Sequence, residues 1–173
     1  MAKNRARSVV SYDLEFAFSG LVPTSERSDG EGTKDASSKT LAEFRSRFGD
    51  AIEEQIRAIP REDRKAYPLT RGETVMVTII QFTGSERVFR DGNDVDNFAK
   101  SILDPLQGRV FEDDSQVQSL SANKLYIDGY ENIVYVGIKR VSKKATYNEL
   151  VKHAGAQHAR DVCDDVLKAE AMR

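Results

Sequence analysis

The run from Glu73 to Gly84 (ETVMVTIIQFTG) constrains the fold of this chain more than any other segment. Its apolar side chains occupy both alternating sets of positions, and β-branched residues are frequent. A strand of this kind is buried on both faces, because neither set of side chains is suited to water. The run therefore predicts a central strand covered by other elements on each side.

Three further segments have the pattern of strands. Between Tyr12 and Phe18, apolar residues alternate with polar or small ones, which is typical of a half-buried strand. The segments Gln116–Leu125 and Asn132–Val141 also read as strands. They are joined around Asp128-Gly129, a hairpin-type signal that leaves the length of the loop open.

The helices are predicted from apolar stripes at spacings of three and four. Thr40 and Glu43 match a capping box, which predicts the start of a helix that ends at Pro60. Residues 97–106 predict a short helix capped by Asp96 or Asn97. Residues 146–173 predict a helical C-terminal extension. The first long helix carries its stripe on Leu41, Phe44, Phe48, Ile52, Ile56 and Ile59.

Composition predicts one compact unit, with residues 1–145 as the domain and 146–173 as the extension. Residues 21–39 have two glycines, one proline and many small polar side chains, so they predict a mobile loop. The single cysteine, Cys163, excludes an internal disulfide. No apolar run approaches the ~20 residues of a membrane span, so we expect a cytoplasmic protein without a membrane partner.

Acidic side chains are concentrated between Asp91 and Asp114, where seven acidic residues stand against two basic ones. The whole chain has a net charge of −2, so the remainder is net positive. An acidic cluster in a mildly basic frame indicates a divalent cation on one side and a polyanion on the other.

Asp94 and Asp96 are the centre of this cluster. On an extended segment, residues two apart point to the same face, where two like charges are costly unless a cation lies between them. Oxygen ligands favour Mg²⁺, or Mn²⁺, over zinc. Lys100 and Asp104 follow at one-turn intervals on the predicted helix, and we expect Asp113 or Asp114 to point toward the first pair if the chain doubles back.

Other interpretations of this D-x-D pattern fail on the sequence. An EF-hand loop that began at Asp94 would need glycine at its sixth position and glutamate at its twelfth, where this chain has Ala99 and Pro105. No Walker-type glycine loop, G-x-S-x-G or H-E-x-x-H motif occurs.

The spacing of these residues resembles the RusA family of Holliday-junction resolvases. The resemblance covers about thirty residues closely and extends more weakly from Tyr12 to Val141. It is carried by Asp94-x-Asp96-Asn97, Lys100, Asp104, Leu106, Gly108, Asp113-Asp114-x-Gln116-Val117 and Lys124.

The resemblance implies an α+β fold, a small mixed sheet flanked by helices, in a homodimer that cuts four-way DNA junctions with Mg²⁺. It implies that Asp94, Asp96 and Asp114 are metal-binding catalytic carboxylates. Lys100 is then the catalytic lysine and Asp113 a supporting metal-binding acid. A two-fold dimer would supply one site for each of two symmetric cuts.

Candidate DNA-binding residues are cations in or near the predicted loops and strands: Arg27, Lys124, Lys139, Arg140, Lys143 and Lys144. Two interpretations stay open for four further cations, a solvated connector or a phosphate contact: Arg61, Arg64, Lys65 and Arg71. Two alternatives to a resolvase also stay open. One is a non-catalytic DNA-binding protein with a structural metal, and the other is a nuclease for other branched DNA.

Overall fold

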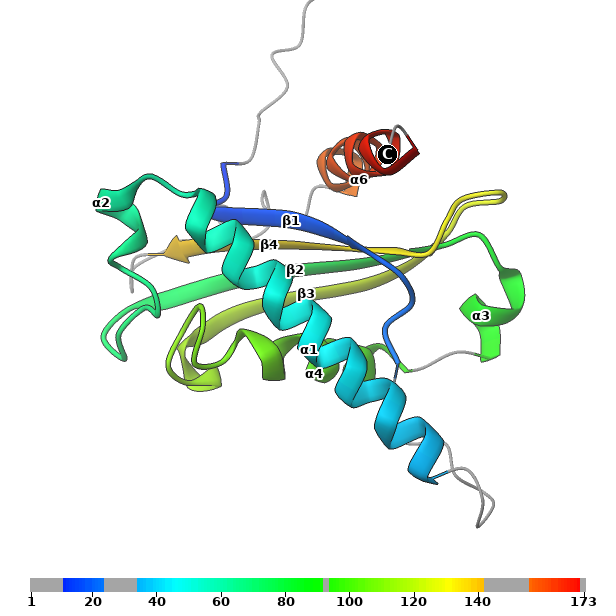
Figure 1. The fold of residues 1–173 in the computed structure, drawn as a ribbon, viewed down its shortest axis with the longest axis horizontal. Coiled ribbons are helices and arrows are strands. Elements are labelled where there is room, and N and C mark those ends of the chain that lie inside the picture. The colour runs from blue at the N-terminus through cyan, green and yellow to red at the C-terminus, as the bar shows by residue number, and fades with distance from the viewer. Residues whose placement is uncertain (1–10, 24–33, 92–93, 142–155, 172–173) are drawn as a thin grey trace, which may run out of the picture.

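The computed structural model describes residues 11–23, 34–91, 94–141 and 156–171, which form one mixed sheet with helices on both faces (Figure 1). The strand order is β1-β4-β2-β3. This architecture confirms the predicted α+β class. In chain order the elements are β1 (Leu14–Ser19), α1 (Lys34–Ala58), α2 (Arg61–Arg64), β2 (Thr74–Thr83), α3 (Glu86–Asp91), α4 (Val95–Leu106), the 3₁₀ helix η1 (Asp114–Gln116), β3 (Val117–Tyr126), β4 (Ile133–Val141) and α6 (Ala156–Ala171).

The central strand is β2, as the apolar run predicts. From Val75 to Thr83 every residue of β2 is buried. Val75, Val77 and Ile79 belong to the core beneath α1 and α4, whereas Ile80 and Phe82 belong to a second core with Cys163 of α6. The alternation of β2 thus supplies two separate hydrophobic cores, one on each face of the sheet.

The predicted hairpin between the last two strands is wrong, although both strands exist. β2 lies between β3 and β4, pairing in parallel with β3 and antiparallel with β4. The turn at Asp128-Gly129 is present, with a hydrogen bond from the Tyr130 amide to the Ile127 carbonyl. It belongs to a connection that crosses the carboxyl end of β2. A Cβ on Gly84 would lie 1.9 Å from the Tyr130 carbonyl oxygen, so only glycine fits beneath this crossing.

Helix α1 carries the predicted apolar stripe but begins earlier than predicted. Phe44, Phe48 and Ile52 are buried against the sheet. The helix starts at Lys34, so Thr40 and Glu43 lie inside it and do not mark its start. A Thr-x-x-Glu pattern also fits a helix interior, because residues three apart are neighbours there. Residues 34–39 are therefore helical, not loop, whereas Arg27 lies outside the described residues.

The path from β2 to β3 is a crossover that contains α3 and α4. Parallel strands require such a connection, and its helix returns in the direction opposite to the strands. α4 consequently begins at the carboxyl end of β2 and ends beside the amino end of β3, as Figure 1 shows. α3 was not predicted from the sequence, because its six residues carry no full apolar stripe.

Helix α6 covers part of the sheet face opposite α1 and α4. Its Cys163 side chain is fully buried, and burial raises the pKa of the thiol to about 12. The Tyr130 hydroxyl donates a 2.6 Å hydrogen bond to Asp164, which ties the β3–β4 connection to this helix. The predicted extension is thus helical over residues 156–171, and residues 142–155 lie outside the described part.

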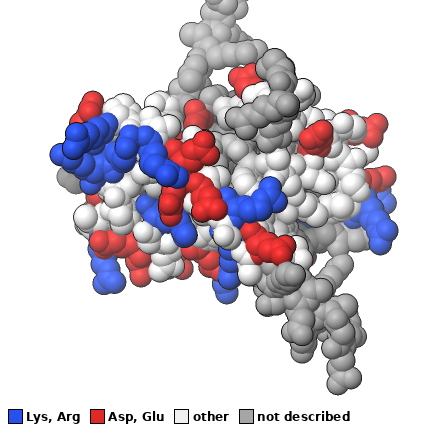
Figure 2. Space-filling view, in the orientation of Figure 1, with Lys and Arg blue, Asp and Glu red and all other residues white. Residues whose placement is uncertain are grey.

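Charged side chains are distributed unevenly over the surface. Figure 2 shows basic side chains gathered over α2 and the neighbouring end of α1, and a smaller basic group over α3. The first group, which we call the basic corner, comprises Arg57, Arg61, Arg64 and Lys65. In the described residues no helix has the length and apolar character that a bilayer crossing requires.

Candidate active site

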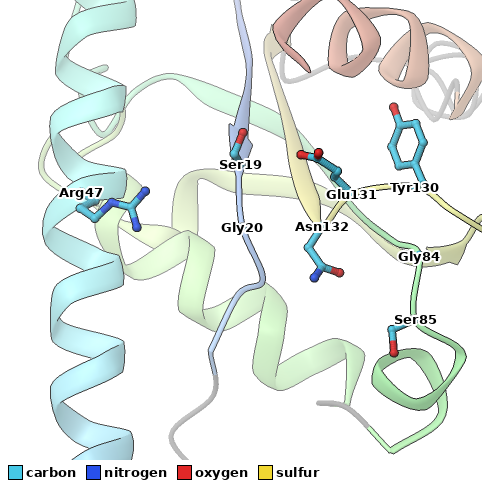
Figure 3. A pocket seen from close by; sticks show the side chains of 8 residues that line it. All are labelled: Ser19, Gly20, Arg47, Gly84, Ser85, Tyr130, Glu131 and Asn132. Atoms are coloured by element: carbon cyan, nitrogen blue, oxygen red, sulfur yellow. The ribbon is translucent and has the colours of Figure 1, made fainter. Parts of the chain in front are cut away.

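A cavity of about 580 Å³ opens at the carboxyl end of β2, between α1 and the β3–β4 connection (Figure 3). None of the predicted catalytic residues lines it, so we place the catalytic chemistry elsewhere. Its lining is Ser19, Gly20, Arg47, Gly84, Ser85, Tyr130, Glu131 and Asn132.

The first group of predicted site residues lies at the start of α4. Asp94 is the N-cap of the helix, but its side chain makes no capping hydrogen bond. Asp96 is in the first turn, Lys100 is one turn further on, and all three residues are exposed. No hydrogen bond or ion pair within the described residues engages these three side chains. The two carboxylates are therefore available to an external cation.

This geometry corrects the reason for the Asp94–Asp96 prediction. Asp94 has extended backbone angles, with φ −60° and ψ 150°, but Asp96 is already helical. The two acids thus do not share one face of a strand. Their position at a helix N-terminus favours negative charge, because unpaired amides and the helix dipole point toward them.

The apolar side of α4 anchors the helix as predicted. Phe98, Ile102 and Leu106 are buried beneath the sheet. Asp104 departs from the predicted polar stripe, since its carboxylate pairs with Arg45 of α1. Asp104 therefore fastens two helices together and is not available to the site at the start of α4.

The second group of predicted site residues forms a rigid turn before β3. Asp113 caps η1 and accepts a 2.9 Å hydrogen bond from the Ser115 amide. Hydrogen bonds from Ser115, through its side chain and its amide, hold the pKa of the Asp113 carboxyl below its ordinary value. Asp114, the first residue of η1, is exposed. Asp113 is thus committed largely to the turn, whereas Asp114 projects an open carboxylate.

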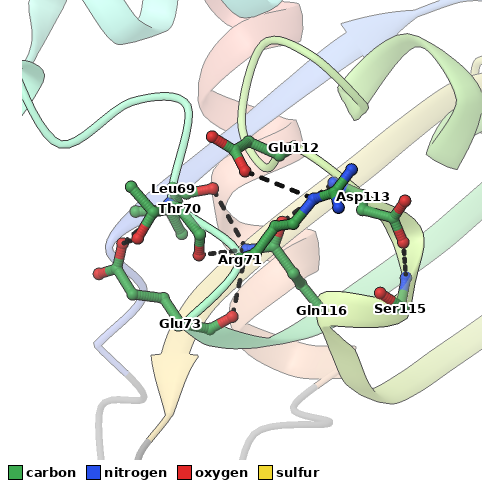
Figure 4. A network of polar contacts seen from close by, with 8 residues as sticks. All are labelled: Leu69, Thr70, Arg71, Glu73, Glu112, Asp113, Ser115 and Gln116. Atoms are coloured by element: carbon green, nitrogen blue, oxygen red, sulfur yellow. Dashed lines mark hydrogen bonds and ion pairs between the residues drawn. The ribbon is translucent and has the colours of Figure 1, made fainter.

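Gln116 fixes this turn to the amino end of β2 (Figure 4). Its buried amide nitrogen donates to the carbonyls of Leu69, Thr70 and Glu73 at 2.8–3.2 Å. Its amide oxygen accepts from the Asp113 N–H at 2.9 Å. The sequence marked Gln116 only as part of a motif, since the three carbonyls to which its side chain donates are more than forty residues away.

The two acidic groups lie at opposite ends of α4 within one chain. The twelve residues of α4 span about 18 Å, and Asp114 precedes Val117, which pairs with Val75 at the amino end of β2. A carboxylate must approach a divalent ion to about 2.0–2.6 Å, so one ion cannot bind Asp94 and Asp114 of the same chain. Among the described residues, no three acidic, histidine or cysteine side chains gather closely enough to hold a metal. The expected return of Asp114 toward Asp94 is therefore not met within a single chain.

The predicted DNA-binding cations are also divided. Lys124 of β3 lies with its ammonium 5.9 Å from the centre of the Phe89 ring. Lys139 and Arg140 are neighbours on β4 and so point to opposite faces. The Lys139 ammonium donates to the Ser11 carbonyl, and Arg140 pairs with Asp13. These two residues do not form the single patch predicted, while Lys143 and Lys144 lie outside the described residues.

The comparison with protein families decides the relationship. A family model described as endodeoxyribonuclease RusA matches residues 39–139, which is more than half of the chain. The chain belongs to the RusA family. No individually curated protein matches it.

The RusA match extends from within α1 into β4. It includes both acidic groups and Lys100, and it confirms the resemblance seen in the sequence. RusA membership identifies this chain with a family of endodeoxyribonucleases that resolve Holliday junctions and generally depend on a divalent metal. β1 and α6 lie outside the match, although β1 completes the sheet and α6 packs against it.

Proposed function

We propose that this protein is a Mg²⁺-dependent, or Mn²⁺-dependent, Holliday-junction resolvase that makes paired symmetric cuts as a homodimer. The observation that carries the proposal is the open set of Asp94, Asp96 and Lys100 at the start of α4, in a RusA-family chain. Asp114 and the supporting Asp113 complete the acidic set.

The side chains fit a hard divalent cation. Asp94 and Asp96 are exposed, and neither engages a described side chain that would have to be displaced. Carboxylate oxygens of this kind suit Mg²⁺ and Mn²⁺. A bound ion of this type supplies Lewis-acid stabilisation of the phosphate and activation of water.

Lys100 supplies a fixed positive charge one helical turn from Asp96. It would hold a phosphate oxygen of the cut strand and stabilise the negative charge that develops during attack. The buried Phe98 and Ile102 on the other side of α4 keep this lysine and the two acids in a constant relation. Such a rigid support is what a charge-stabilising site requires.

The acidic set is completed by a second copy of the chain. Asp114 of one subunit lies beside Asp94 and Asp96 of its partner, and the two-fold axis repeats the arrangement. The separation of about 18 Å along α4 supports this proposal, because it keeps the two groups apart in one chain. Two equal sites result, one for each strand to be cut.

Phosphate contacts come from cations near both ends of the sheet. Lys124 lies on the face of β3 that carries α4, and the basic corner lies near the other end. Arg61 and Lys65 of this corner are exposed. With a net charge of −2, the protein depends on such local groups for DNA affinity.

Cleavage of a synthetic four-way junction, beside linear duplex of the same sequence, tests the proposal. We expect paired nicks in the junction with Mg²⁺ and none with EDTA. Asp96→Asn should lower the cleavage rate by about 10²–10³-fold or more, the scale set by removing one preorganised electrostatic group, while junction binding persists.

Asp104→Asn is the matched control, because Asp104 pairs with Arg45 away from the site. Its cleavage should stay near the wild-type rate. Equal cutting of duplex and junction would show a nuclease without junction selectivity, and the resolvase proposal would fail. Binding without cutting by the wild type would leave only the non-catalytic alternative.

A further inference from the structure

Two exposed aromatic rings meet beside the start of α4. Phe89 of α3 is 38% exposed and Tyr126 of β3 is 40% exposed. Their ring centres are 6.3 Å apart, and the planes are tilted by 42°. The Tyr126 hydroxyl donates a 3.2 Å hydrogen bond to Asp128, which restrains the orientation of that ring. Two adjoining, partly exposed rings offer an aromatic surface on which a planar ligand can stack.

The rings lie at the same end of the sheet as Asp94. Tyr126 pairs with Thr83, the last residue of β2, and Phe89 precedes Asp94 by five residues. Ala122 packs into the core that contains Phe98 of α4, and Tyr126 points to the same side of β3, because it lies four residues on. The rings and the open carboxylates therefore occupy one end and one side of the molecule.

Charges of both signs lie around the rings, with Asp128 hydrogen-bonded to Tyr126 and a cation over Phe89. The Lys124 ammonium lies over Phe89, and α3 itself carries Arg87 and Arg90. Figure 2 shows a small basic group over α3, with acidic side chains nearby. Glu86 neutralises Arg90 in part. An aromatic face with a lysine ammonium over it suits a nucleobase and its adjoining phosphate.

We propose that Phe89 and Tyr126 form a stacking platform for an unpaired nucleobase of the DNA substrate, with Lys124 at the adjoining phosphate. The inference rests on the proposed function, since it assigns the platform to the DNA that the site cuts. Bases inside a duplex hide their faces, so the platform selects DNA at the point where strands leave the duplex. Stacking of this type contributes about 5- to 150-fold in affinity per base.

The chain contains no tryptophan, so Phe89→Trp provides a single fluorescent reporter. In the Asp96→Asn background, which removes cutting, it should be quenched by a four-way junction with one unpaired thymine at the branch point. An otherwise identical junction with an abasic residue at that position should leave the fluorescence unchanged. Equal quenching by both junctions, or by neither, would overturn the proposal.

Affinity measurements with Phe89→Leu and Tyr126→Leu check the result without the reporter. Each should remove the preference for thymine over the abasic residue, by about 5- to 150-fold, while duplex binding is unchanged. Tyr126→Phe should keep the preference, because it retains the ring. Leu120→Ala, at a residue 43% exposed and about 20 Å away along β3, should also keep it. An intact thymine preference in both leucine variants would contradict the platform.

Sedimentation of the same variants separates the platform from a subunit contact. Dissociation of the dimer by Phe89→Leu would show that the rings bind a second chain, and the proposal would fail. The junction-cleavage assay of the wild type is independent of all these measurements. If the leucine variants lose the thymine preference and the wild type does not cut the junction, the platform is upheld and the nuclease is rejected.

Discussion

Gln116 is the residue on which the position of Asp113 and Asp114 depends. Its side chain joins two loops that are distant in sequence, through three donated hydrogen bonds and one accepted bond. Because the side chain is buried, water cannot replace these bonds if it is removed. One side chain therefore holds the acidic turn against the amino end of β2.

Replacement of this side chain tests its role. Gln116→Leu should lower the free energy of unfolding by about 3 kcal/mol, since it leaves several backbone groups without partners. Urea denaturation measures the change. The matched variant Gln118→Leu, at an exposed position of β3, should stay within about 0.5 kcal/mol of the wild type. Similar losses in both variants would contradict the role assigned to Gln116.

The sequence indicates which residue types form the candidate site but not how they are placed. The excess of acids around Asp94 and Asp96 indicated a cation site, and the structure leaves these carboxylates open. The sequence allows them to lie on an extended segment, because the D-x-D spacing alone does not distinguish such a segment from a helix start. Asp104 looked equivalent to Asp96 by spacing. Only the packing of α1 on α4 shows that Arg45 engages it.

At the scale of elements, the crossing of the β3–β4 connection over Gly84 determines how the carboxyl end of the sheet is packed. The β3–β4 connection passes directly over this glycine and is held to α6 through Tyr130. No larger residue fits without moving the connection. The same connection lines the cavity at this end, so its position affects the surface near the rings.

An added methyl group tests this crossing. Gly84→Ala should lower the free energy of unfolding by about 1–3 kcal/mol, the usual cost of overpacking. Gly72→Ala is the matched control, since a Cβ there would meet no atom within 4 Å. It should be neutral or slightly stabilising. Thermal denaturation measures both changes. An equal change in stability in the two variants would contradict the role assigned to Gly84.

The basic corner can be tested through the salt dependence of junction binding. Arg57→Ala and Arg61→Ala should each reduce the slope of log affinity against log salt by about 1, if each side chain neutralises one phosphate. Lys168→Ala, an exposed cation on α6 over the other face of the sheet, should leave the slope unchanged. Unchanged slopes for both arginine variants would remove the corner from the DNA interface.

Strands and long helices followed from local patterns, whereas their arrangement did not. The alternation between Tyr12 and Phe18 and the apolar run of β2 both predicted strands that the structure confirms. The turn at Asp128-Gly129 looked like a hairpin, because local sequence does not reveal that β2 separates β3 from β4. Non-local pairing of this kind depends on the whole sheet.

At the scale of the whole molecule, the β2–α3–α4–β3 crossover decides where the proposed catalytic groups lie. It carries Asp94 and Asp96 to one end of α4 and Asp114 to the other. Their closeness in sequence suggested a single cluster, but the length of α4 separates them. The proposed dimer resolves this separation, and each active site then needs both subunits.

The most direct test of this claim is cleavage by a mixture of two inactive variants, Asp96→Asn and Asp114→Asn. If each site combines Asp96 of one chain with Asp114 of its partner, a mixed dimer has one site with both changes and one intact site. Mixing the two variants after mild dissociation should therefore restore cleavage of a four-way junction as single nicks. In an equimolar mixture, up to about half of the dimers are mixed and carry the intact site. If the mixture stays as inactive as each variant alone, although mixed dimers form, the shared site is contradicted.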